Sequence, residues 1–314
     1  VAADLGLSNE YNHKFWKMFR KTVKAANPNA LILAEHYGDP AAWLRGDEWD
    51  TVMNYDAFME PLTWFVTGME KHSDDYQEGQ FGNADSFIGA MRYHMASFMA
   101  PSQQVAMNEL SNHDHSRFLT RTNHRVGRMD HFDYDAASDG VNPAVMREAV
   151  VMQMTWPGAP TVYYGDEAGV CGFTDPDNRR TYPWGHEDTQ MLEFHREIIA
   201  LHKAHPVFTG GSLQFLMGDY NCLAYGRFDA REKMVVVFNN NGEDRDLTIK
   251  VWPAEVEANQ KLRRIFFTDG AGYTAEPEEY QADQGELRLH MPPTSAMVLM
   301  AVPNGEKTEK QTKI

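Results

Sequence analysis

Cysteine is scarce in this sequence. Only Cys171 and Cys222 occur among the 314 residues, and they lie far apart. Two isolated cysteines exclude a disulfide framework and a cysteine-rich metal knuckle. We therefore expect both to be ordinary thiols, buried or half-buried.

Long apolar runs and an excess of positive charge are missing as well. No stretch of about 18 consecutive apolar residues occurs, so we expect no membrane partner. The 29 Lys and Arg residues face 45 Asp and Glu residues, a formal net charge of -16. This charge argues against a phosphate-binding surface, and hence against a nucleic-acid partner, but places no restriction on a neutral substrate.

Three apolar runs, each ending in a polar cluster, are the most informative feature that the sequence does contain. They cover residues 31–36, 105–114 and 160–167. Buried parallel strands have this pattern, because the strands provide the apolar residues while their carboxyl ends and the following loops carry the chemistry. Two of these ends carry a carboxylate, Glu35 and Asp114.

Helical and strand patterns alternate over the first two-thirds of the chain. Apolar spacing predicts helices near residues 11–26, 57–67, 84–98, 143–154 and 190–203, and strands near 31–34, 51–53, 105–110 and 160–164. Four such alternations indicate a parallel sheet with helical crossovers. The polar segment 71–76 reads as a solvated loop.

The pattern changes near His205 and Pro206. Short strands without long helices follow, and we expect residues 206–303 to form a separate antiparallel β-sandwich. The strands are predicted at residues 213–216, 223–227, 234–238, 247–251, 264–267, 287–291 and 296–301. Residues 304–314 are polar and rich in Lys, and we expect them to be disordered.

Four segments together resemble the α-amylase family, glycoside hydrolase family 13. They are Ala34-Glu35 after a strand, Asn112-His113-Asp114 after the next strand but one, residues 158–167, and residues 175–184, in the order of that family. Within the family, residues 53–55 and 175–184 look most like the neopullulanase, cyclomaltodextrinase and maltogenic amylase branch.

The resemblance implies a fold of class α/β, the carboxyl-terminal half of a (β/α)8 barrel over residues 1–205, followed by the β-sandwich. The family's nucleophile ends the fourth barrel strand in a Gly-x-Arg-x-Asp motif, commonly followed by Val-Ala, and this chain begins Val1-Ala2-Ala3-Asp4. The resemblance therefore implies that the nucleophilic Asp immediately precedes Val1, and that the chain by itself is inactive.

The resemblance also assigns roles to individual residues. Glu35 is expected to be the general acid/base of retaining glycoside cleavage, and Asp114 the carboxylate that stabilises the oxocarbenium-like transition state. His113 is expected to bind substrate beside Asp114, Asp175 and Arg179 to contact the sugar on the donor side, and Tyr37 to serve the leaving-group side. The expected partner is an α-glucan oligosaccharide or polysaccharide, and homo-oligomerisation stays open. We predict no metal site or cofactor in this chain. The resemblance allows a calcium site in the half of the barrel that this sequence does not include.

Other interpretations stay open at this stage. Glu35 could form a structural ion pair, Asn112-His113-Asp114 a loop turn, and Asp175 with Arg179 a surface salt bridge. At the level of function, the alternatives are a non-catalytic sugar-binding relative or pseudoenzyme, a glucosyl transferase of the same family, and a metal-dependent amidohydrolase. The last rests on the His-x-His spacing of His113 and His115, with His36 after a strand.

Overall fold

The computed structural model describes residues 5, 6 and 8–303. The disordered tail predicted for residues 304–314 and the amino-terminal motif at residues 1–4 lie outside the described residues. None of the helices formed by the described residues is both long and apolar enough to cross a bilayer.

Four short parallel strands follow one another in space in the order in which they occur in the chain. They are β1 (Leu33–Ala34), β2 (Thr51–Val52), β3 (Met107–Glu109) and β4 (Ala159–Thr161). β1 pairs with β2 and β3 with β4, both in parallel, and a parallel bridge between Met53 and Met107 joins the two pairs. The predicted parallel sheet is confirmed, although each strand is shorter than its apolar run.

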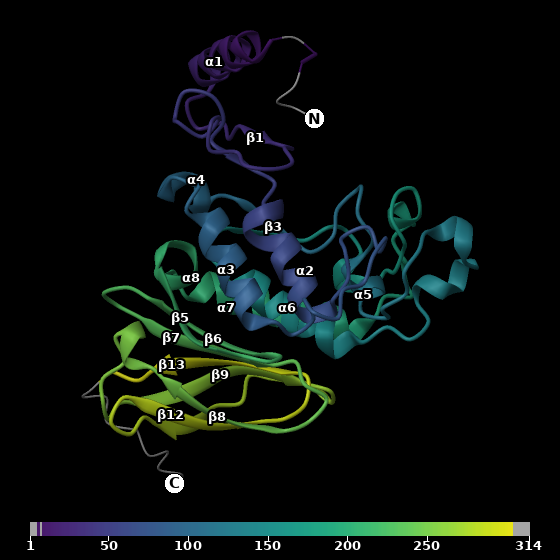
Figure 1. Cartoon of the computed structure of the whole chain (residues 1–314). Helices are drawn as coiled ribbons and strands as arrows, with labels where there is room; N and C mark the ends of the chain where they lie inside the picture. Colours follow the sequence, from purple (N-terminus) through teal and green to yellow (C-terminus); the bar gives the residue numbers. More distant parts are fainter. Residues whose placement is uncertain (1–4, 7, 304–314) are drawn as a thin grey trace.

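Helices connect these strands and cover them (Figure 1). Several begin at a residue whose side chain accepts a backbone N–H of the first turn, as Ser8, Asn83, Asn142 and Asp188 do. The α-helices are α1 (Asn9–Ala26), α2 (Glu60–Thr67), α3 (Ala84–Met95), α4 (Ala100–Gln104), α5 (Phe118–Arg121), α6 (Pro143–Thr155), α7 (Thr189–Ala204) and α8 (Val207–Gly210). The segment predicted as one helix over residues 57–67 instead starts with a π-helical turn, η1 (Tyr55–Met59), before α2.

The carboxyl-terminal part is antiparallel, as predicted. A seven-stranded sheet has the order β10-β9-β13-β7-β6-β5, with β11 also paired to β9, and β8 pairs separately with β12. Its strands are β5 (Ser212–Asp219), β6 (Cys222–Phe228), β7 (Lys233–Asn239), β9 (Lys261–Asp269), β10 (Gly272–Thr274), β11 (Glu278–Gln281) and β13 (Ser295–Ala301), and the second layer is β8 (Arg245–Lys250) with β12 (Glu286–Met291). One hydrophobic cluster fills the space between the two layers.

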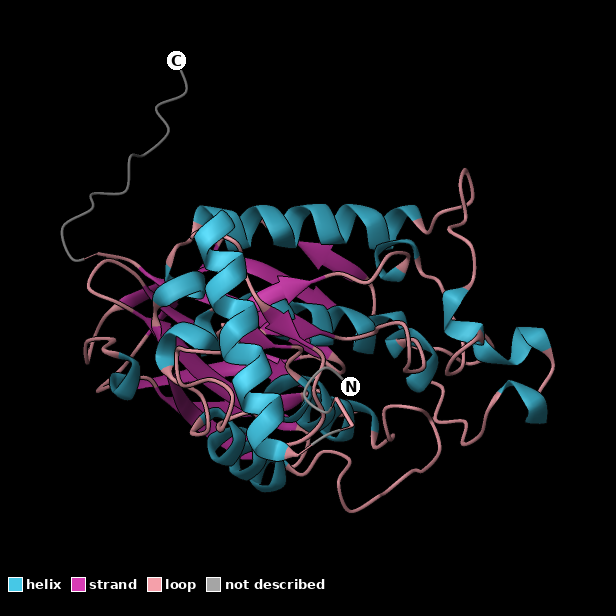
Figure 2. Ribbon diagram, turned by 90° about the horizontal axis from the view of Figure 1, so that it is seen from above, coloured by secondary structure: helices cyan, strands magenta, loops and turns pink. Residues whose placement is uncertain are grey.

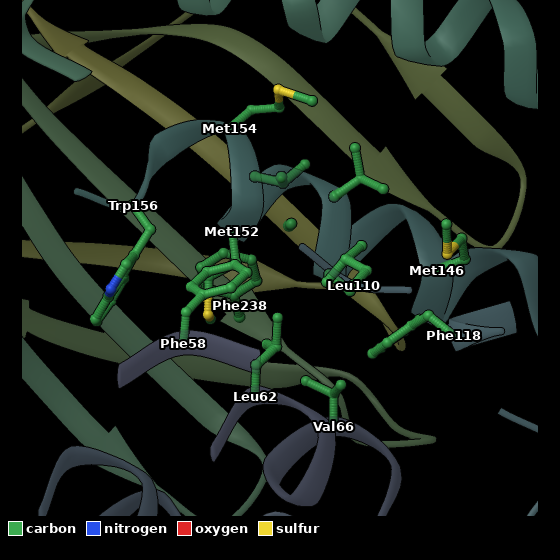
Figure 3. Packing of buried hydrophobic residues seen from close by; sticks show 14 of the residues in the cluster. Phe58, Leu62, Val66, Leu110, Phe118, Met146, Met152, Met154, Trp156 and Phe238 are labelled. Atoms are coloured by element: carbon green, nitrogen blue, oxygen red, sulfur yellow. The ribbon is translucent and has the colours of Figure 1, made fainter. Parts of the chain in front are cut away.

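The other face of the large sheet packs directly on the helices of the half-barrel. A single hydrophobic cluster contains Phe58 and Leu62 from η1 and α2, Met152 from α6, and Phe238 and Val298 from the sheet. Figure 3 shows Phe58, Leu62, Met152 and Phe238 meeting in this cluster. Viewed from above, the helical part overlies the strands of the sheet, so the two parts are stacked as layers (Figure 1 and Figure 2). The chain thus changes from helices to strands near residue 205, while its core continues across that point.

Arg227 stabilises the junction between the half-barrel and the large sheet. It is fully buried in β6, and its guanidinium donates to five backbone carbonyls. These belong to the end of α6, to α8 with the residue after it, and to the start of β5, namely Thr155, Val207, Phe208, Gly211 and Ser212. Burial lowers the pKa of Arg227 to about 10. This value is still well above 7, so the guanidinium is charged at neutral pH. A buried cation is thereby solvated by backbone dipoles alone from three elements.

Replacing Arg227 by Met should destabilise the chain by at least about 3 kcal/mol, because several buried carbonyls would lose their only charged donor. Equilibrium unfolding in urea measures this change. Arg288→Met, at an exposed position of β12, is the matched control and should change the free energy of unfolding by no more than about 0.5 kcal/mol. Equal effects of the two substitutions would show that Arg227 has no special role in the junction.

Candidate active site

The predicted site residues Glu35 and Asp114 meet at the carboxyl ends of neighbouring strands, together with Tyr55, which was not among the predicted site residues. Glu35 directly follows β1, Tyr55 lies just after β2, and Asp114 lies in the turn that follows β3. Because parallel strands direct their carboxyl ends toward one edge, residues far apart in the chain come together here.

Glu35, His113 and Asp114 form the centre of the site. One side-chain ligand atom from each lies within 4.8 Å of the other two. His113 Nε2 is 3.1 Å from Glu35 Oε1 and 3.5 Å from Asp114 Oδ1, so the imidazole stands between two carboxylates. Each side chain keeps between 31% and 39% of its surface exposed, which leaves polar atoms free to contact a substrate.

Asp175 and Arg179 lie at the rim of this centre. Arg179 Nε is 2.6 Å from Asp175 Oδ1, and Arg179 Nη2 is 3.8 Å from Asp114 Oδ1. The two residues therefore form the surface salt bridge that was one of the alternatives, but they form it beside the proposed transition-state carboxylate. Both side chains are about half exposed, so the pair is accessible to a sugar.

Tyr37 joins the site through both its ring and its hydroxyl. Its ring stacks on Tyr55 with the centroids 4.7 Å apart, and its hydroxyl donates to Asp114 Oδ2 at 3.4 Å. The hydroxyl also lies 3.3 Å from His115 Nε2. Burial and the negative charge of Asp114 raise the pKa of Tyr37 to about 12, so the phenol stays protonated and remains a hydrogen-bond donor at neutral pH.

The side chain of Asn112 fixes the turn that carries the catalytic candidates. Its Oδ1 accepts the backbone N–H groups of Asp114 and His115, each at 2.9 Å. Its Nδ2 donates to Glu109 Oε1 at 2.7 Å and to the hydroxyl of Tyr55 at 3.3 Å. One buried amide thus connects the turn after β3 with the end of β2. The turn predicted as an alternative is present, and it serves to position Asp114.

Glu109 is a buried carboxyl group beneath this turn. Its Oε2 is buried without a hydrogen-bond partner among the described residues. Burial is the main reason that its pKa rises to about 8, and the charge of Glu35 adds to the effect. Glu109 is therefore a neutral acid at pH 7. No pattern in the sequence singles out this group, because its position in the apolar run of β3 predicts only a strand end.

The prediction that residues 71–76 form a simple solvated loop was wrong. Ser73 is fully buried and donates to the hydroxyl of Ser116, which lies just past the turn after β3. His72 Nδ1 lies 3.0 Å from the hydroxyl of Thr174, and the ring of His72 packs edge-on against His115. The polar composition of this segment concealed its role as a support of the site.

The structure does not assemble the histidine set that the amidohydrolase alternative requires. His36 packs against Trp43 and Trp49, while His115 is buried beside Tyr37. Burial, and next the charge of Arg121, lowers the pKa of His115 to about 2, so its imidazole stays neutral. Among the described residues, only Glu35, His113 and Asp114 form a group that could hold a cation.

Glu109→Gln should flatten the pH dependence of stability. The folded pKa is about 8 and the ordinary value is 4.5, so between these pH values the unfolded chain releases a proton that the folded chain keeps. The free energy of unfolding of the native sequence should therefore fall as pH rises, by up to about 1.4 kcal/mol per pH unit, and should level off above pH 8.

Urea unfolding at several pH values between 4 and 9 measures the effect of this substitution. Gln retains the acceptor for Asn112 and cannot ionise, so Glu109→Gln should lose that slope, whereas the exposed Glu243→Gln should keep it. A slope that is the same in all three proteins would contradict the assignment of a neutral Glu109.

Comparisons with known proteins show what the whole chain is similar to. Residues 7–286 match the family model described as "Alpha amylase, catalytic domain". Neopullulanase 2 of Thermoactinomyces vulgaris is 34% identical over 301 residues, which cover 94% of this chain and 44% of that protein. A cyclomaltodextrinase of a Bacillus species is 32% identical over 241 residues, 76% of this chain and 38% of that protein.

A solved structure has the same fold over most of the chain. The native form of the Nostoc punctiforme debranching enzyme aligns with a TM-score of 0.73 and 28% identity, over 91% of this chain and 55% of that one. This chain spans less than half the length of the two curated relatives. The family match over most of its residues and these relatives establish that the chain belongs to the α-amylase family.

Proposed function

We propose that this chain carries the acid/base and the transition-state carboxylate of a retaining α-glucan hydrolase. The observation that supports the proposal is the arrangement of Glu35, His113 and Asp114, whose polar atoms face one another at the carboxyl ends of β1 and β3. Family membership supports the choice of reaction, and the geometry supports the choice of residues.

Glycosidic cleavage by these groups follows from their positions. Glu35 donates its proton to the glycosidic oxygen of the departing sugar, which makes that oxygen a better leaving group. Asp114 accepts hydrogen bonds from ring hydroxyls, and its negative charge stabilises the positive charge that develops at the anomeric carbon. His113, between the two carboxylates, holds them apart and offers a further donor to the sugar. The nucleophile of this mechanism is not assigned to any residue that the structure describes.

The proposed substrates are maltodextrin, starch, cyclodextrin or pullulan, cleaved at α-1,4 linkages and in some of them at α-1,6 linkages. Support comes from relatives named neopullulanase, cyclomaltodextrinase and amylopullulanase. The open, partly exposed centre also suits a sugar acceptor, so transfer to a second sugar accompanies hydrolysis in this proposal. Aromatic faces such as that of Tyr37 pack well against the C–H face of a glucose unit.

Glu35→Gln should lower the rate of maltotetraose hydrolysis by about 10²- to 10⁴-fold, because the leaving oxygen loses its proton donor. Asp114→Asn should lower it by at least about 10²-fold, through loss of charge in the transition state. Both are assayed in the full reading frame that encodes this chain, and the anomeric form of the product is read by NMR.

A substrate with fluoride as its leaving group separates the two roles. Maltosyl fluoride needs no proton donor for its cleavage, so kcat/KM, which reports that step, should largely recover in Glu35→Gln and stay low in Asp114→Asn. Overall turnover of Glu35→Gln should stay slow, because Glu35 is also the base that activates water in the second step. Glu243→Gln, at an exposed position outside this centre, is the control and should hydrolyse both substrates. Full activity of Glu35→Gln on maltotetraose, or an inverted product, would refute the proposal.

A further inference from the structure

A second pocket lies on the outside of the half-barrel, between α2 and α3. Figure 1 shows these two helices side by side, and they are in direct contact. The pocket has a volume of about 380 Å³, and none of Glu35, His113 or Asp114 lines it. Its walls come from η1, α2, α3 and the segment before α3, and include Asp56, Glu60, Trp64, Gln80, Phe87 and Ala90.

We propose that this pocket binds one pyranose unit of a neutral glucan chain, as a sugar site separate from the catalytic centre. The choice of an α-glucan as its ligand rests on the proposed function, whereas the pocket itself does not. Its size falls within the range of small-molecule sites, about 300 to 1,000 Å³.

The apolar wall of the pocket is aromatic. Trp64 on α2 is partly exposed, and the buried Phe65 and Phe87 line the same pocket. A partly exposed indole offers apolar ring surface, which suits the C–H surface of a pyranose. Ala90 on α3 contributes only a methyl group, which keeps the space open.

Polar groups with unused hydrogen-bonding capacity complete the lining. Ser86 donates to Gln80 Oε1 at 2.6 Å, which orients the amide of Gln80 and leaves its nitrogen without a partner in the described part of the chain. The shortest ion-pair distance of the Asp56 carboxylate among the described residues is 3.9 Å, to His94 Nδ1, which is too long for a hydrogen bond. A donor and an acceptor are therefore both available, as a sugar ring bearing several hydroxyl groups requires.

The charges in the pocket favour a neutral ligand. Glu60 pairs with Lys71, so its charge is compensated. Burial and the charge of Glu60 raise the pKa of Asp56, which further limits the negative charge. At most one uncompensated carboxylate remains, which is too little to select a cation and unfavourable for an anion. A polyhydroxylated, uncharged molecule matches this lining better than either.

The test follows the indole N–H signals of the full chain in ¹⁵N NMR spectra during titration with maltotriose. The signal of Trp64 is identified by its absence in Trp64→Phe. Ala90→Met fills the pocket without removing a polar group, and Gly89→Met is its matched control, because a side chain at Gly89 on the same helix meets open space. A further variant, the double catalytic variant, carries Glu35→Gln and Asp114→Asn together and so lacks both catalytic carboxylates.

The Trp64 signal should shift in a saturable way in the native chain, in Gly89→Met and in the double catalytic variant. The apparent Kd should rise at least about ten-fold in Ala90→Met, the equivalent of about 1.4 kcal/mol. An absent shift, a shift lost in the double variant, or one unchanged by Ala90→Met would overturn the second site. Unimpaired hydrolysis by the double catalytic variant, assayed in the full reading frame, would refute the proposed function alone if the Trp64 shift persists.

Discussion

The parallel pairing of four short strands determines where every polar group of the site lies. Each strand is only two or three residues long, too short to be stable by its own ladder of hydrogen bonds. Side chains reinforce the ladder, as where Asn54 donates to Asn108 Oδ1 at 2.7 Å and Asn108 in turn donates to the carbonyl of Pro157. These buried amides connect the strand ends and so stabilise the register of the strands. The turn that carries Asp114 follows β3, so its position depends on that register.

Beneath the exposed carboxylates lies a layer of buried polar groups that are mostly neutral. Glu109 and His115 are kept uncharged by burial, as the shifts in their pKa values indicate. The charged members are Arg117, which pairs with the buried Asp166 at 3.0 Å, and the fully buried Arg121, which donates to the carbonyl of Leu110. The support beneath the exposed carboxylates therefore combines neutral groups with guanidinium groups that have partners of their own.

The sequence predicts the order of the elements and the meeting of Glu35 with Asp114, because apolar runs with polar ends report strand direction reliably. It does not predict contacts that depend on tertiary packing. The π-helical turn at Tyr55–Met59 has no pattern of its own, and the short strands β10 and β11 lack alternating apolar residues. Ser73 lies in a polar segment, so nothing in its surroundings indicates that it is buried. Glu109 is likewise invisible until the fold encloses it.

Helix α6 limits how the half-barrel and the large sheet can be exchanged between related proteins. Every residue of this helix after Pro143 is buried, because it lies between the half-barrel and the large sheet. Two partners therefore constrain its sequence at once, and Arg227 attaches its last turn to a strand of the sheet. A chimaera that joins this half-barrel to the sheet of a distant relative would confront α6 with an unmatched surface. The half-barrel and its sheet should therefore be exchanged together. Exchange of either part alone requires that α6 be redesigned.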